Sequence, residues 1–125
     1  MNFLEITHTP LGMLVVLFAC HYIVDFALQN EWVAVNKSRH SKRKSTDDQG
    51  LPISFLWPHL LTAHSFQHGF FVMMFTQNLK IGVAEIISHW ITDYGKCEGW
   101  FGFHVDQFIH LVTKALWVAI LFNYI

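Results

Sequence analysis

The sequence predicts an all-α protein, an integral membrane four-helix bundle with a helical hairpin, formed by its second and third helices, at its centre. Hydrophobic residues make up 53% of the 125 residues and charged residues only 14%, which is unusually apolar for a soluble domain of this size. The hydrophobic residues gather in four segments, most of them close to the roughly 17–25 residues that cross a hydrocarbon layer. Polar side chains recur inside these segments at four-residue spacing, which places them on one helix face. We therefore predict a single transmembrane domain, residues 1–125, with helices at about 11–29, 58–77, 79–94 and 105–124.

A soluble helical bundle with an unusually rich apolar core is the alternative fold. It is disfavoured because the polar residues outside the four segments are too few to cover such a bundle. The first segment could also be a signal peptide, but it lacks a basic leading region and an A-x-A cleavage signal. We expect this segment to be retained as the first helix, since Pro10 is typical of a first helical turn.

The segment that follows the first helix is positively charged, and residues 33–52 are predicted to form a mobile loop. It holds five of the eight basic residues of the chain: Lys37, Arg39, Lys42, Arg43 and Lys44. The positive-inside rule makes this loop cytoplasmic and puts both termini outside, which predicts a multi-pass protein of the bacterial inner membrane. Trp32, Trp57 and Trp100 then fall at the cytoplasmic interface. The basic loop could instead bind nucleic acid, but charges beside helix ends more often set orientation, so we expect no nucleic acid partner.

The second and third predicted helices form a hairpin with a tight turn at residues 76–78. The second helix carries His64 and His68, and the third carries His89 and Asp93. A four-residue step turns a helix by about 400°, so each pair lies on one face. Folding the hairpin brings His89 level with His68 and Asp93 level with His64. The two polar faces are therefore expected to meet, with the third helix as the shared wall of a site.

Each of the four helices carries one pair of His or Asp residues at four-residue spacing. All four pairs lie at a similar depth, about 3–15 Å inside the predicted cytoplasmic ends at 1.5 Å per residue. An ionisable side chain costs about 2.5–3.5 kcal/mol at the centre of a membrane helix, so eight of them need compensation from one another or from a metal. We predict that all eight are metal ligands: His21, Asp25, His64, His68, His89, Asp93, Asp106 and His110.

Five imidazoles and three carboxylates suit Zn, Mn or Fe, and we expect one or two divalent ions. If the centre is catalytic, its natural reaction is hydrolysis. A bound metal lowers the pKa of its water to about 7, and a carboxylate then moves the proton. The predicted catalytic carboxylates are Asp25, Asp93, Asp106 and Glu85.

Further polar residues are expected to support the ligands or to stand apart from them. Gln29, Glu85 and Gln107 are predicted to orient ligands by hydrogen bonding. Lys114 is expected to pair with Asp106 or Glu85. Four histidines have no partner four residues away and are not expected to be ligands: His8, His40, His59 and His104.

The predicted function is the metal-dependent hydrolysis of a lipid, or of an amphipathic ester or phosphoester, at the cytoplasmic leaflet. Membrane lipids are the expected partners, and association with a membrane protein or with a second copy of the chain is left open. One alternative is a non-catalytic membrane interaction protein that uses the site as a structural element. Another is an ion transporter, which would need polar groups through both leaflets, whereas the outer halves of the helices are almost entirely apolar.

Three elements of the sequence resemble a known family. They are the run Asp25–Trp32 followed by Asn36-Lys37, the spacing His89-x3-Asp93, and Asp106-Gln107-x2-His110. Together they resemble a family of small bacterial and phage membrane proteins, domain of unknown function 3307, over nearly the whole chain. The resemblance implies a multi-helix membrane protein and supplies no activity. More distantly, the His and Asp residues inside short helices are similar to those of membrane-bound metal-dependent hydrolases of bacterial inner membranes, an analogy without residue assignments.

Overall fold

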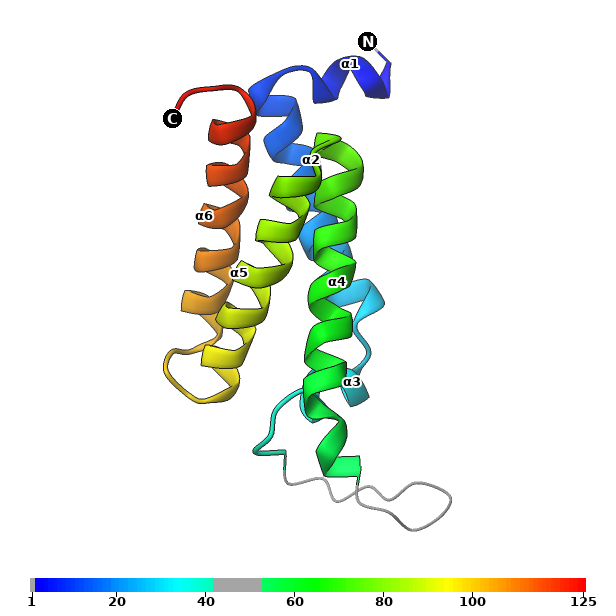
Figure 1. Cartoon of the computed structure of the whole chain (residues 1–125), viewed down its shortest axis with the longest axis vertical. Coiled ribbons are helices and arrows are strands. Elements are labelled where there is room, and N and C mark those ends of the chain that lie inside the picture. Colours follow the sequence, from blue (N-terminus) through cyan, green and yellow to red (C-terminus); the bar gives the residue numbers. More distant parts are fainter. Residues whose placement is uncertain (1, 42–52) are drawn as a thin grey trace.

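The computed structural model describes residues 2–41 and 53–125, and within these ranges the protein is helical without any β-strand (Figure 1). The predicted all-α fold class is confirmed. Six α-helices are joined by a π-helical segment, η1, and a 3-10 segment, η2. In chain order the elements are α1 (Phe3–Thr7), α2 (Pro10–Tyr22), η1 (Ile23–Leu28), α3 (Glu31–Asn36), η2 (Ile53–Leu56), α4 (Trp57–Thr76), α5 (Leu79–Cys97) and α6 (Phe103–Leu121).

Four long helical segments lie side by side: α2 with η1, α4, α5 and α6 (Figure 1). The predicted hairpin is the α4–α5 pair. Its turn contains Gln77 in the left-handed region, with φ 51°, and the side chain of Asn78 caps α5 by accepting from the Ile81 amide at 3.1 Å. Both residues are typical of a chain that ends one helix and begins the next.

The two helices of the hairpin approach closely at a pair of glycines. A Cβ atom on Gly69 would lie 2.1 Å from Cγ1 of Ile86 and 2.8 Å from the carbonyl oxygen of Gly82. Neither glycine position therefore has room for a larger side chain unless the helices separate. This close approach brings His68, the neighbour of Gly69, against His89 on α5.

Two short helices, α1 and α3, lie outside the four predicted helices. Asn2 and Glu5 form a capping box that begins α1, ahead of the predicted first helix. Asn30 caps α3, accepting from the Val33 amide at 2.9 Å, inside a stretch that includes part of the predicted mobile loop 33–52. Lys37 at the end of α3 is buried, so the first part of that loop is packed against the bundle and the prediction was wrong there. Residues 42–52, with Lys42, Arg43 and Lys44, lie outside the described residues.

The first long helix changes its winding where it reaches its polar residues. From Ile23 to Leu28 it is a π-helix, and the Gln29 amide donates to the Val24 carbonyl five residues earlier, at 3.0 Å. The extra residue in this turn alters the direction in which the side chains of Asp25 and Gln29 leave the helix. The four-residue stripe predicted from His21 through Gln29 is therefore broken after Asp25.

The bundle divides into two halves along its length. The half nearer the chain termini, called here the apolar half, has a core of Met13, Leu17, Val72, Ile81, Trp117 and Val118. The other half, called the polar half, contains the eight predicted ligands. It ends at α3 and the α5–α6 connection (Figure 1). Among the described residues, one helical segment, Pro10–Leu28, is long and apolar enough to cross a membrane, with a mean hydropathy of 2.1.

Candidate metal centre

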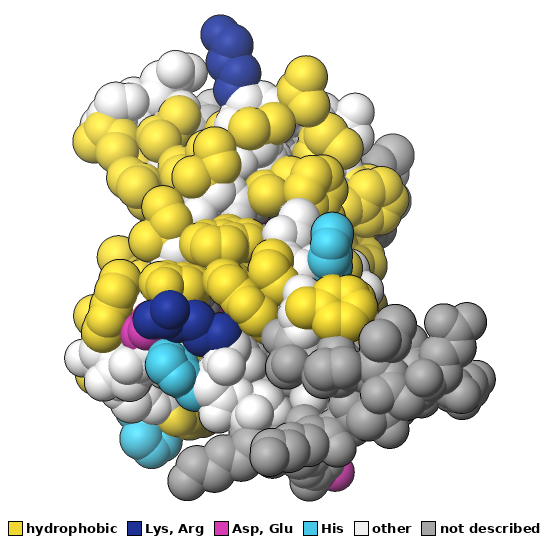
Figure 2. Space-filling view, turned by 60° about the horizontal axis from the view of Figure 1, so that its bottom comes forward, with side chains coloured by type: hydrophobic (Ala, Val, Ile, Leu, Met, Phe, Trp, Pro, Cys, Tyr) yellow, Lys and Arg dark blue, Asp and Glu magenta, His cyan; other side chains and the backbone are white. Residues whose placement is uncertain are grey.

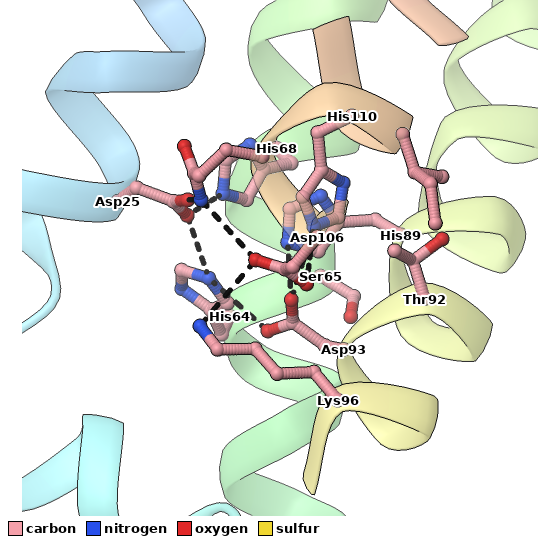
Figure 3. Close-up of polar contacts among 12 residues, drawn as sticks. Asp25, His64, Ser65, His68, His89, Thr92, Asp93, Lys96, Asp106 and His110 are labelled. Atoms are coloured by element: carbon pink, nitrogen blue, oxygen red, sulfur yellow. Dashed lines mark hydrogen bonds and ion pairs between the residues drawn. The ribbon is translucent and has the colours of Figure 1, made fainter. Parts of the chain in front are cut away.

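The structure brings all eight predicted ligand side chains into one cluster in the interior of the polar half. Each pair comes from a different helical segment, so the site is shared by all four long segments. Figure 3 shows Asp25 facing His64 and His68, while Asp93 lies beside His110. Seven of the eight residues are buried, and the side chain of Asp25 is 9% exposed.

One group of possible ligands is centred on Asp25. Its Oδ1 atom lies 3.1 Å from Nε2 of His64 and 2.9 Å from Nε2 of His68. One ligand atom from each of these residues and one from His89 all lie within 4.8 Å of one another. Tetrahedral zinc with bonds of about 2.0–2.1 Å separates its ligand atoms by about 3.3 Å, so small side-chain movements suffice for this group to bind an ion.

Two further groups adjoin the first. His21, His89 and His110 form one, and Asp93, Asp106 and His110 form the other, each within the same 4.8 Å limit. His89 and His110 are the shared members. The ring of His89 stacks on the rings of His68 and His110, with centroid distances of 3.6 and 4.1 Å. The eight residues thus form a continuous cluster, with His89 at its centre.

Several polar atoms in this cluster are buried without a hydrogen-bond partner among the described residues. Both ring nitrogens of His89 are in this position, as are Nδ1 of His21, Nδ1 of His64 and Oδ1 of Asp106. A buried polar atom without a partner is destabilising by about 1–3 kcal/mol. Such atoms are rare in folded proteins and call for a ligand or an ion.

Three lysines reach the carboxylates of the polar half. Lys37 from the end of α3 donates to Oδ2 of Asp93, and both side chains are almost fully buried. Lys96 places Nζ 3.4 Å from Oδ2 of Asp106. The third lysine, Lys114, donates to Glu85 at 2.5 Å, which is one of the two pairings expected for it.

Sequence reasoning missed Lys37 and Lys96 as members of the site, because both lie outside the four predicted helices. Two signals were available: Lys96 follows Asp93 by three residues and His89 by seven, which is one helix face, and Lys37 is part of the Asn36-Lys37 element noted in the family resemblance. Lys37 also belongs to the basic cluster that was interpreted only as an orientation signal. Its side chain is buried in an ion pair with Asp93, and a count of the charges along the sequence cannot reveal that contact.

The predicted supporting residues behave differently from one another. Gln107 contacts three members of the cluster: its Oε1 accepts from Nε2 of His21 at 3.0 Å, and its Nε2 donates to Asp25 at 2.9 Å and to Asp106 at 3.2 Å. The Gln29 side chain donates to the backbone carbonyl of Asp25 at 3.4 Å, and its Oε1 atom has no hydrogen-bond partner within the described residues.

Glu85 was predicted to be a catalytic carboxylate, and its contacts oppose that role. Oε1 accepts from Lys114, and Oε2 accepts from the Trp117 indole at 2.6 Å. Glu85 belongs to none of the three ligand groups. It lies 3.5 Å from Nδ1 of His89, so it supports the central imidazole from the apolar side.

The four histidines that were set apart are all exposed and lie outside the cluster: His8, His40, His59 and His104. His40 instead contacts Glu98 at the rim of the polar half, at 3.1 Å. The Arg39 guanidinium donates to both oxygens of Glu98, and with His40 it lowers the pKa of that carboxyl from 4.5 to about 2.

Comparison with known proteins gave a single kind of match. The comparisons with curated proteins and with solved structures returned no match. A family model described as "Protein of unknown function (DUF3307)" matches residues 13–124, a range that includes every residue of the cluster. The chain therefore belongs to the DUF3307 family of proteins of unknown function.

Proposed function

We propose that this protein is an integral membrane four-helix bundle whose polar half binds a divalent metal, and that the metal centre hydrolyses a lipid or an amphipathic ester or phosphoester. The observation that carries the proposal is the buried cluster of eight His and Asp side chains, several of whose nitrogen and oxygen atoms have no partner among the described residues. A divalent cation bound there would satisfy both the lone pairs and the negative charge.

The distribution of polarity supports a membrane location. Among the residues whose burial is described, thirteen buried side chains are polar or charged and ten are hydrophobic. Many large hydrophobic side chains are instead exposed, and apolar side chains cover much of the described surface on the face drawn in Figure 2. This is the reverse of a soluble protein, which keeps charged groups outside and rarely exposes extended apolar patches. Exposed apolar side chains run at four-residue spacing along the long helices: Leu11 and Val15; Phe66, Phe70 and Met74; Val83, Ile87 and Ile91; Phe108, Val112, Leu116 and Ile120.

This arrangement explains why the mean hydropathy of α4, α5 and α6 is lower than that of α2. Their inward faces carry the polar cluster, which lowers the mean over each helix, while their outward faces remain suitable for lipid. The two termini lie at the same end of the bundle, and the basic segment after η1 begins at the other end (Figure 1). We therefore propose the bacterial inner membrane, with both termini outside and the polar half in the cytoplasmic leaflet.

The proposed chemistry assigns different roles to the carboxylates. A bound metal would lower the pKa of its water and stabilise developing negative charge on the substrate. We assign proton transfer to Asp106, whose Oδ1 atom accepts no hydrogen bond from the described residues and lies 3.4 Å from Nε2 of His110, while Oδ2 is held by Gln107 at 3.2 Å and lies 3.4 Å from Lys96. Glu85 is left out of this role, since both its oxygens are engaged.

A structural role for the centre is the second candidate. The specific observation in its favour is burial: the predicted ligands are nearly inaccessible, so a substrate reaches them only if the polar half opens. Transport is disfavoured, because the packed side chains around Leu17 and Val72 close the apolar half to ions.

The experiment is to purify the full chain in detergent, measure Zn, Mn and Fe by mass spectrometry, and assay lipids and nitrophenyl phosphodiesters. His68→Ala should remove most of the metal, whereas His59→Ala, an exposed histidine on the same helix, should retain it. Asp106→Asn should keep the metal and lose hydrolysis. Metal that binds as predicted without any hydrolysis would favour the structural role, and wild-type protein without metal would refute the centre.

The membrane orientation is tested separately. A periplasmic reporter enzyme fused after Ile125 should be active, and a cytoplasmic reporter at the same position should be inactive. The opposite pattern would place the polar half in the outer leaflet and remove the proposed access from the cytoplasmic side.

A further inference from the structure

We propose that the cluster takes one metal ion, at Asp25, His64, His68 and His89, and that Lys37 and Lys96 occupy the place of a second ion at Asp93, Asp106 and His110. This inference rests on the proposed metal centre and assigns its position and stoichiometry. The observations that carry it are the partners of the individual carboxylates in the polar half.

The carboxylates fall into two classes by their partners. Asp93 is paired with Lys37, Asp106 with Lys96 and Glu85 with Lys114. Asp25 has only neutral hydrogen-bonding side chains and imidazoles around it within the described part of the chain: His21, His64, His68 and Gln107. Asp25 is therefore the carboxylate whose charge the protein itself does not balance with an ammonium group.

The charge balance favours one ion over two. With neutral imidazoles, the four carboxylates and three lysines of the polar half sum to a net charge of −1. One divalent ion changes this to +1, and two would change it to +3. Buried charge without compensation is strongly destabilising, so the second ion is excluded as long as the lysines remain in place.

The geometry agrees with this division. Two imidazole Nε2 atoms, from His64 and His68, converge on the same Oδ1 atom of Asp25 at 3.1 and 2.9 Å. His89, whose two ring nitrogens have no hydrogen-bond partner within the described residues, supplies the fourth ligand atom. Three imidazoles and one carboxylate are a complete tetrahedral set for zinc. In the other group, Oδ2 of Asp93 is already taken by Lys37, and Oδ1 lies 3.1 Å from His110.

The lysines then act as specificity-determining residues rather than as ligands. Lys37 is 4% exposed and comes from the end of α3, while Lys96 is 31% exposed and comes from the last turn of α5. Both ammonium groups enter from the same end of the bundle. Removal of these two charges leaves Asp93 and Asp106 as an unbalanced pair beside His110, which is the arrangement that a second cation would stabilise.

The test uses the full chain in detergent, loaded with excess zinc and then desalted, with zinc measured per chain. Wild type should hold one zinc ion, and Asp25→Asn should lower this by about tenfold or more, since it removes the charged ligand. Lys37→Met and the double variant Lys37→Met, Lys96→Met should gain zinc, toward two ions per chain. Lys80→Met, which removes an exposed lysine at the other end of α5, is the matched control and should stay at one.

Each result decides the proposal. Two zinc ions in wild type, or full zinc in Asp25→Asn, would overturn the assignment while leaving a metal centre intact. Wild type without zinc would refute the metal centre itself. If the lysine variants fold and gain no zinc, the lysines do not exclude a second ion. If they fail to fold, the number of zinc ions in wild type and the loss of zinc in Asp25→Asn decide the position of the ion. The independent readout is the visible spectrum of the cobalt-loaded protein, which should be present in wild type and lost in Asp25→Asn.

Discussion

The two halves of the bundle use the same four helical segments and are held together in different ways. In the apolar half, side chains such as Leu17 and Val72 are fully buried against one another. In the polar half, the interior consists of imidazoles, carboxylates and lysines. Lipid is as apolar as a leucine side chain, so in a membrane the apolar half would be stabilised mainly by close packing. The polar half is stabilised by charge balance and, in the proposed function, by metal coordination, so a change there should have larger consequences.

The largest loss of stability is expected from breaking the ion pair of Lys114 and Glu85, at the boundary between the two halves. Lys114→Met leaves Glu85 as a buried carboxylate with only the Trp117 indole as a strong donor. Breaking a buried ion pair by removing one partner costs about 3–5 kcal/mol. We expect a loss of stability of about this size, measured by denaturant unfolding in detergent. The double variant Glu85→Gln, Lys114→Met should lose much less, and an equal loss in both would show that packing, not charge, holds this pair.

Removal of the metal should have the next largest effect. An ion present at a hundred times its dissociation constant stabilises the folded state by about 2.7 kcal/mol. We therefore expect a chelator to lower the melting temperature of wild type, because Asp25 and its imidazoles lose their cation. Asp25→Asn should melt at the same temperature with and without chelator. A chelator response that persists in this variant would place the ion elsewhere in the polar half.

A substitution in the apolar half should destabilise the bundle without touching the metal. Leu17 is fully buried, and Leu17→Ala in a core costs about 2–5 kcal/mol, with the lower end expected where lipid replaces water as the surroundings. The metal content should remain that of wild type, and the chelator should still lower the melting temperature by the same amount. Loss of metal from Leu17→Ala would mean that the two halves are coupled more closely than their separate cores indicate.

Within the polar half, the sequence predicts some features better than others. The convergence of His64, His68, His89 and Asp93 followed from four-residue spacing and from hairpin register, because both are fixed by regular helix geometry. The π-helical turn at Asp25 has no such regularity, so the predicted position of Gln29 was wrong. Winding that depends on packing against other helices is not encoded in the spacing of nearby residues.

Lys37 shows a different limit of the sequence. It lies just after the short helix α3, in a segment that the composition assigned to a loop, and its long side chain can reach in many directions. Its contact with Asp93, which is distant in the sequence, depends on the tertiary fold. The pairing of Lys114 with Glu85 was among the expectations because both residues occupy inward faces of regular helices at matching depth. Charge pairs inside helices were thus predictable, and those made from helix ends were not.

The smallest expected effect concerns an ion pair in the polar half that is exposed rather than buried. Glu98 accepts from Arg39 at 2.6 and 2.8 Å, and its pKa is lowered from 4.5 to about 2. A carboxyl whose pKa is lower in the folded state contributes stability above the unfolded pKa, and this contribution is lost as the pH falls through the folded pKa. The relevant window is therefore between about pH 4.5 and pH 2.

Exposed ion pairs stabilise little, because water screens both charges. We expect Glu98→Gln to leave the global melting temperature at neutral pH nearly unchanged and to increase amide hydrogen exchange in the segment around Arg39. A loss of stability comparable to that of Lys114→Met would show that this rim contact anchors α3, and with it Lys37, to the metal centre.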